Sequence, residues 1–182
     1  MSAETSFPPP IGARKLHRVA ALALLPLLAL PSGSPRAEEA RGVQTAATLT
    51  PETALAAAQA ALRYCRDAGW QVSVAVVDRS AAPLVVLRDR YAGFHTLDAG
   101  IGKARTAVSF RTPTGQLAEA TQPGKPESGL RGIPGLVMVA GGLPLEASGS
   151  VVGGIGVSGA PGGGSDERCA EAGIKAVEDQ LF

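Results

Sequence analysis

The feature that most constrains the fold is a run of glycines in the last third of the chain. Residues 152–159 read Val-Gly-Gly-Ile-Gly-Val-Ser-Gly. Gly154, Gly156 and Gly159 have the spacing that binds a dinucleotide pyrophosphate when a strand leads into a crossover helix. That site also needs a second parallel strand after the helix, and the sequence ends at Phe182, one helix later. We therefore expect a buried strand whose glycines allow close backbone contact, and no nucleotide site.

Local signals predict the elements around this strand. Thr50 caps a first helix, Pro51 begins it and Gly69 ends it. Further helices are expected over 96–109, over 113–120 and from Ser165 or Asp166 to Gln180, and strands are expected at 72–77, 84–87, 136–140, 145–147 and 150–157. The last three strands are joined by short turns, so they must be antiparallel. The fold class is α+β, an antiparallel sheet of about five strands with helices packed on its faces.

Residues 122–135 are predicted to form a long loop, because they contain three prolines and four glycines. Long loops in compact domains are often functional.

The N-terminus has the layout of a secretory signal peptide. Arg14, Lys15 and Arg18 precede an apolar run over 19–30, and a polar, small-residue stretch follows to Ala37. The run is shorter than the roughly 20 residues of a comfortable membrane span. We expect a signal peptide at 1–37, a flexible lead-in at 38–48, a domain at 49–182 and a periplasmic or extracellular location. A retained membrane anchor is the alternative.

The charge of the exported part excludes several functions. From Glu38 onward there are about 13 Lys and Arg against about 15 Asp and Glu, a net charge near −2 without a basic tract. Nucleic-acid binding needs a clustered positive face, so we expect none. His95 is the only histidine after the leader, which excludes a zinc site built on several histidines.

Five motifs in order carry a family resemblance. They are Val74–Arg79 followed by Pro83–Leu87, Ala92–Ala99 with Lys103 and Thr106, Ser109–Thr114, Ile133–Gly135, and the glycine run at 152–159. Together, over about residues 48–182, they resemble the GlcG/HbpS-like haem-binding family, which is related to the C-terminal domain of PduO-type corrinoid proteins. The resemblance implies a profilin-like fold, a haem or similar tetrapyrrole ligand, and a homo-oligomer.

His95 is the leading candidate for a ligand to haem iron or to a free iron ion. It stands where a loop enters the helix predicted over 96–109, next to Phe94 and close to Tyr91, whose rings suit a porphyrin face. Asp98 follows by three residues, so both side chains can face one ion. The alternative is a surface or capping histidine.

Three basic residues are candidate partners of haem propionates. Arg90, Lys103 and Arg105 would bind carboxylates through charge-assisted hydrogen bonds. The form Ala-Gly-x-His-Thr at 92–96 resembles one subgroup of the family and adds Thr96 to the cofactor-binding candidates. The alternative for each basic residue is a solvated surface charge.

Two further questions stay open at this level. Cys65 and Cys169 fit a disulfide of an exported protein or two buried free thiols. Ser158 stands in a Gly-x-Ser-x-Ala segment, which departs from a hydrolase nucleophile elbow at its fifth residue. A hydrolase would also need His95 as base, oriented by Asp78, Asp89 or Asp98.

Three functions follow from these observations. The first is an exported tetrapyrrole-binding protein, a carrier or a sensor. The second is an enzyme acting on haem or a small metabolite, with a haem-degrading or peroxidase-like activity. The third is a structural or signalling oligomer in which the loop at 122–135 contributes to subunit contacts.

Overall fold

The computed structural model describes residue 42 and residues 44–181. The expected signal peptide at 1–37 lies outside the described residues. The elements are α1 (Pro51–Asp67), β1 (Ser73–Asp78), β2 (Pro83–Arg88), α2 (His95–Phe110), α3 (Thr114–Ala120), a 3-10 helix (Pro126–Gly132), β3 (Gly142–Ala147), β4 (Ser150–Ser158), α4 (Gly163–Lys175) and a 3-10 helix (Glu178–Gln180). None of the helices in this part of the chain has the length and apolar character needed to cross a bilayer.

The sheet has four antiparallel strands in the order β2-β1-β4-β3. The prediction of about five strands is wrong by one, since residues 136–140 form no strand. The backbone N–H of Val137 donates instead to Thr106 Oγ1 on α2, at 2.9 Å. This segment therefore lies against a helix, and β3 begins only after it, at Gly142.

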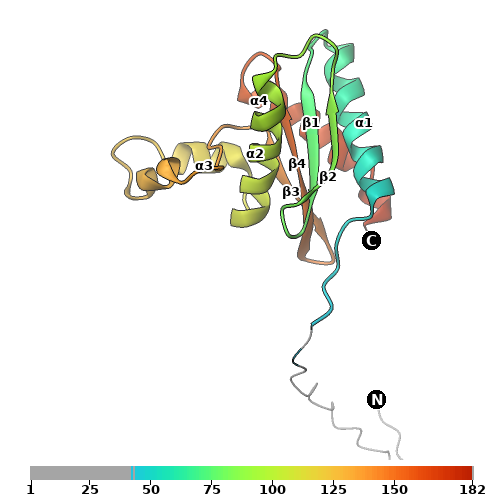
Figure 1. Cartoon of the computed structure of the whole chain (residues 1–182), viewed down its shortest axis with the longest axis horizontal. Helices are drawn as coiled ribbons and strands as arrows, with labels where there is room; N and C mark the ends of the chain where they lie inside the picture. The colour runs from blue at the N-terminus through green and yellow to red at the C-terminus, as the bar shows by residue number, and fades with distance from the viewer. Residues whose placement is uncertain (1–41, 43, 182) are drawn as a thin grey trace, which may run out of the picture. The chain divides into compact units, whose positions relative to one another are not determined.

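Helices cover both faces of the sheet (Figure 1). Helices α1 and α4 lie on one face, where Val74, Val76, Ile155 and Val157 are fully buried against the alanines of α1. Helix α2 lies on the other face, where Ala104 and Val108 form a smaller apolar cluster with Val77. The alternation of side chains along β1 and β4 sends successive residues into these two layers.

The glycines of β4 allow α2 to lie directly on the sheet. A Cβ atom added at Gly156 would stand 2.6 Å from the backbone nitrogen of Ala104, and it would overlap the carbonyl oxygen of Gly100. No larger residue fits unless the helix moves. The prediction of a buried strand with close backbone contact is therefore confirmed.

A disulfide bond joins Cys65 of α1 to Cys169 of α4, across 104 residues of sequence. Both cysteines are fully buried, so of the two alternatives the structure has the disulfide. Helix α4 ends at Lys175, earlier than the predicted end at Gln180, and a short 3-10 turn follows it. The predicted loop at 122–135 contains a 3-10 helix. The Arg131 side chain links this loop to the end of α3, because it donates hydrogen bonds to the carbonyl oxygens of Thr121 and Ala118, at 2.6 and 2.8 Å.

Candidate functional site: a histidine corner at the start of helix α2

The chain presents three aromatic side chains where it turns from β2 into α2. Tyr91 is 78% exposed, Phe94 is 86% exposed and His95 is also exposed. The rings of Phe94 and His95 are perpendicular, with their centroids 5.9 Å apart. We call these three residues the histidine corner. Large exposed aromatic side chains grouped at one point are typical of a surface that a ligand or partner covers.

Asp89 fixes the loop that carries the histidine corner. Its side chain is buried, and both carboxylate oxygens accept hydrogen bonds from Arg66 of α1, at 2.7 and 2.9 Å. The Arg66 guanidinium holds the pKa of the Asp89 carboxyl below its ordinary value. The backbone N–H of Asp89 donates to Val72, and its carbonyl accepts from Ala92. The loop is thus tied to α1 and to the segment entering β1, a support that sequence reasoning missed because Arg66 and Asp89 are 23 residues apart.

Thr96 supports the corner from beneath. Its side chain is only 2% exposed. Its hydroxyl donates to the Gly93 carbonyl at 2.6 Å and shares a 2.8 Å hydrogen bond with the Ser73 hydroxyl on β1. Thr96 therefore holds the start of α2 against the sheet, and its hydroxyl is already engaged within the protein.

The imidazole of His95 folds back over Gly93. A Cβ atom added at Gly93 would stand 2.7 Å from His95 Cε1 and 3.0 Å from Nδ1. Within the part of the chain that the structure describes, no hydrogen bond to the imidazole is found. A neutral imidazole in this position keeps a lone pair for a metal ion.

Asp98 lies one turn further along α2 and is exposed. It lines a groove of about 440 Å³ between α2 and residues 135–137, together with Ile101 and Arg105. The Arg105 Nε donates to the Ala81 carbonyl at 3.1 Å. No cluster of three or more His, Cys, Asp or Glu side chains suited to a metal ion occurs among residues 42 and 44–181. An ion held by His95 and Asp98 would therefore need further ligands from haem or from water.

Lys103 lies in the core and not at the corner, contrary to the expected propionate contact. It is 2% exposed, and its ammonium donates to Asp166 Oδ2 at 2.7 Å and to the Val157 carbonyl at 2.9 Å. Burial raises the pKa of the Asp166 carboxyl, although the Lys103 ammonium pulls it the other way. Arg90, by contrast, is exposed next to Tyr91 and is the basic side chain adjacent to the corner in sequence.

Two of the aspartates considered for a hydrolase, Asp78 and Asp89, have other partners. Asp78 accepts hydrogen bonds from the backbone of Ser80 and Ala82, at 2.7 and 2.9 Å, and so shapes the turn between β1 and β2. Asp89 is committed to its arginine. Exposed aromatic faces, a lone imidazole and an exposed guanidinium instead suit a flat ligand that carries an acidic group.

Comparisons with known proteins show the family of the chain. The model of the family described as "Haem degrading protein HbpS-like" matches residues 49–175. A 15.0 kDa protein of Citrobacter freundii, encoded in the dhaT-dhaS intergenic region, is 34% identical over 118 residues, which are 64% of this chain and 83% of that protein.

Two solved structures have the same fold. A double mutant of HbpS from Streptomyces reticuli is 41% identical, with a TM-score of 0.72 over 81% of this chain and 99% of that one. A PduOC:haem complex is 28% identical, with a TM-score of 0.68 over 71% of this chain and 94% of that one.

Proposed function

Because the chain belongs to the HbpS-like family, we propose that it is an exported protein that binds haem or a similar tetrapyrrole, as a carrier or a sensor. The observation that supports this most directly is the histidine corner. It combines an imidazole with two large exposed rings on a loop that the buried carboxylate of Asp89 holds in place through its ion pair with Arg66. A relative of the same fold has been solved as a haem complex.

Each residue of the corner has a separate task in this proposal. His95 would supply a nitrogen ligand to the iron, and Tyr91 and Phe94 would pack against the porphyrin. Arg90 pairs with a propionate. Haem, when bound, supplies the iron and its absorption band, while the protein's own groups orient the ring and exclude water from it. Asp98 belongs to a second mode, in which a free iron ion binds beside His95.

The test is a haem titration followed by absorption spectroscopy. His95→Ala should shift the Soret band and weaken haem affinity by about tenfold or more, with the fold intact by circular dichroism. Tyr64→Ala, which removes an exposed aromatic ring on α1, away from the corner, should leave the titration unchanged. Asp98→Asn should affect binding of ferrous or ferric ions without haem, and not the Soret band. A His95→Ala protein with the spectrum and affinity of the parent would refute the assignment.

The second candidate function is haem degradation, which the family's description favours. The haem-loaded protein would be mixed with hydrogen peroxide or with a reductant and oxygen. Bleaching and iron release faster than for free haem would support turnover. Bleaching and iron release at the rates of free haem would contradict haem degradation and favour a binding protein.

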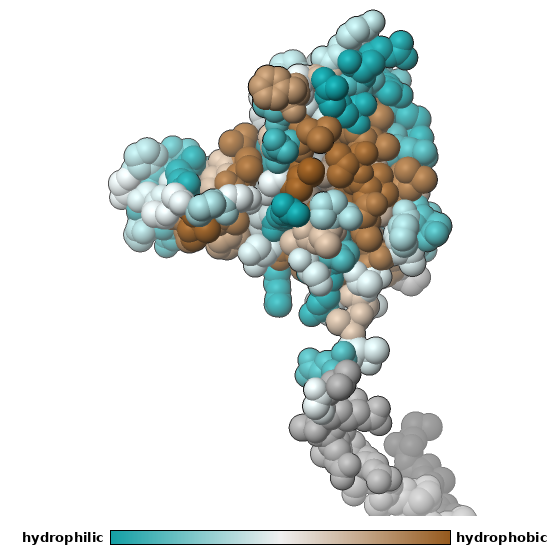
Figure 2. All heavy atoms as spheres, viewed as in Figure 1, coloured by the Kyte–Doolittle hydropathy of each residue, from teal (hydrophilic) through white to brown (hydrophobic). Residues whose placement is uncertain are grey.

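We further propose that the protein is a homo-oligomer, because β2 is an edge strand with an apolar surface. The side chains of Leu84, Val85, Val86 and Leu87 are all only half-buried. Hydrophobic surface gathers over this strand between α2 and α1 (Figure 2). An exposed apolar edge strand pairs readily with a second copy.

A single charged substitution on β2 tests whether this edge strand forms the contact between subunits. Val86 does not pack against either apolar core cluster, so Val86→Lys should shift the mass measured by light scattering toward the monomer without unfolding the domain.

Export is tested separately by mass spectrometry of the periplasmic or secreted form, which should begin near Glu38. An intact N-terminus on a cytoplasmic species would contradict it.

A further inference from the structure

A second concave site lies at the opposite end of α2 from the histidine corner. The turn between β1 and β2, the last turn of α2 and the hairpin between β3 and β4 meet there around a cavity of about 440 Å³. Its walls include Arg79, Arg111 and Glu146, with Val108 and Val151 between them. This volume falls within the range of pockets that hold small molecules.

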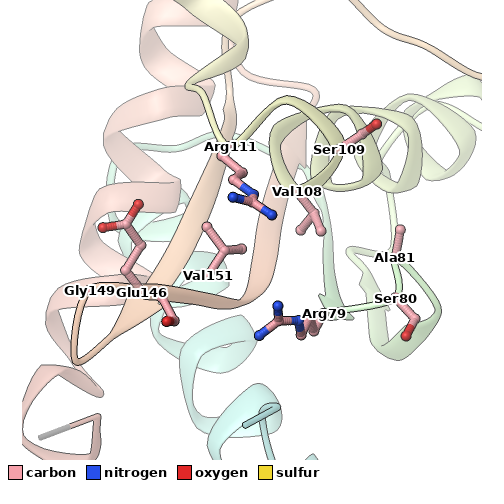
Figure 3. A pocket seen from close by; sticks show the side chains of 10 residues that line it. Arg79, Ser80, Ala81, Val108, Ser109, Arg111, Glu146, Gly149 and Val151 are labelled. Carbon is pink, nitrogen blue, oxygen red and sulfur yellow. The ribbon is translucent and has the colours of Figure 1, made fainter. Parts of the chain in front are cut away.

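Two arginine side chains share this cavity. Figure 3 shows the guanidinium groups of Arg79 and Arg111 reaching into the same space in front of Val108 and Val151. Among the described residues the only ion pairs are those of Arg66 and of Lys103, so neither cavity arginine is neutralised by one. Glu146 also lines the cavity without forming an ion pair with either. Two like charges directed at one space favour an anion between them.

The backbone around the cavity has a conformation that is uncommon for its residue types. Three non-glycine residues of the described chain have positive φ: Ala81 at 64°, Arg111 at 51° and Ser148 at 49°. Ala81 and Arg111 line the cavity, and Ser148 precedes the lining residue Gly149. Left-handed backbone costs a non-glycine residue free energy, and such residues concentrate at binding sites.

Arg111 occupies the position after a helix where glycine is most favourable. An arginine at this position is favourable in its own right, because its positive charge stabilises the negative C-terminal end of the helix dipole. That effect does not account for Arg79, which comes from a different element and reaches into the same cavity.

We propose that this cavity binds a small organic anion, a carboxylate or a phosphate ester, held between the guanidinium groups of Arg79 and Arg111. Guanidinium groups match the planar, paired oxygens of such groups. Val108 and Val151 form the apolar wall on which the rest of the ligand lies, and Glu146 faces a hydroxyl or amine on it. None of the described residues that line the cavity is aromatic, and the cavity lies at the opposite end of α2 from the histidine corner, so it is distinct from the proposed haem site.

Calorimetric titration of the purified protein with succinate and with inorganic phosphate, at constant ionic strength, tests the proposal. At least one probe should bind saturably, and the tighter one identifies a carboxylate or a phosphate site. Arg79→Gln and Arg111→Gly should each weaken binding by about ten- to a hundredfold, the effect of losing a charge-assisted hydrogen bond. Arg63→Gln on α1, with the same change in charge, is the matched control and should bind like the parent. Glu146→Gln should tighten binding of these two probes, because it removes a negative charge from the cavity and neither probe carries an amine to pair with it.

The Arg111→Gly variant also separates binding from folding. Glycine relieves the left-handed backbone, so this variant should melt at the parent temperature or above while it loses the anion. Three outcomes would overturn the proposal: no saturable binding of either probe, unchanged affinity in Arg111→Gly, or equal weakening in Arg63→Gln.

Discussion

Replacing Gly156 by alanine should push α2 away from the sheet and destabilise the fold. The added Cβ would stand 2.6 Å from the Ala104 nitrogen and 3.2 Å from the Ala104 Cα, and it would overlap the Gly100 carbonyl oxygen. Favourable contacts between carbon and other heavy atoms lie at about 3.5–4.0 Å, so the helix would have to move by about 1 Å. All the nearest atoms are backbone atoms, which cannot rotate away as a side chain does.

The cost follows from this displacement. Overpacking a close-packed core costs about 1–3 kcal/mol, and the movement also loosens Ala104 against the sheet. We therefore expect Gly156→Ala to lower the free energy of unfolding by about 3 kcal/mol, and Tm by about 10 °C. The matched control is Gly100→Ala, on the other side of the same contact. Its Cβ would meet the Gly156 oxygen at 3.4 Å and the Ser73 oxygen at 3.5 Å. It should be neutral, or stabilising by up to about 1 kcal/mol, because alanine favours the helix.

The assay is urea unfolding of both variants with the disulfide intact, followed by circular dichroism. An unfolding free energy for Gly156→Ala within about 0.5 kcal/mol of the parent would refute the close-packing argument. An equal loss of unfolding free energy in Gly100→Ala would refute the argument that only the Gly156 side of this contact lacks room for a Cβ atom. Titration of the parent with NAD and ATP should show no saturable binding at micromolar concentration, since the glycines serve packing.

Three further results are expected. Cys65→Ser should lower the free energy of unfolding by about 4–5 kcal/mol in chemical denaturation, because the disulfide closes a loop of 104 residues. Lys103→Met should cost about 3–5 kcal/mol by leaving Asp166 buried without its cation, and the double variant with Asp166→Asn should recover part of that loss. Arg66 lowers the pKa of Asp89, so this pair stabilises the fold above the unfolded pKa and its contribution is lost as pH falls below about 4. When the free energy of unfolding is measured against pH, it should fall less on acidification in Arg66→Gln than in the parent protein.

The sequence alone predicted the elements whose signals are local. Helix α2 was expected over 96–109 and runs from His95 to Phe110, and the first helix starts where Thr50 caps it. The valines and isoleucine of the glycine run predict a buried strand, and its glycines predict the close backbone contact that the structure has. The strand predicted at 136–140 is wrong, since an apolar run of that length does not reveal which partner takes its hydrogen bonds.

The tertiary structure decided everything that depends on distant partners. Lys103 is basic and lies near His95 in sequence, but its ammonium binds Asp166, 63 residues away. The arginine cavity has the same origin, since Arg79 and Arg111 belong to separate turns that meet only when α2 lies on the sheet. Backbone hydrogen bonds and caps act within a few residues, so a sequence pattern reveals them. Which charges are paired and which remain free depends on the faces that packing brings together, and the fold alone determines those.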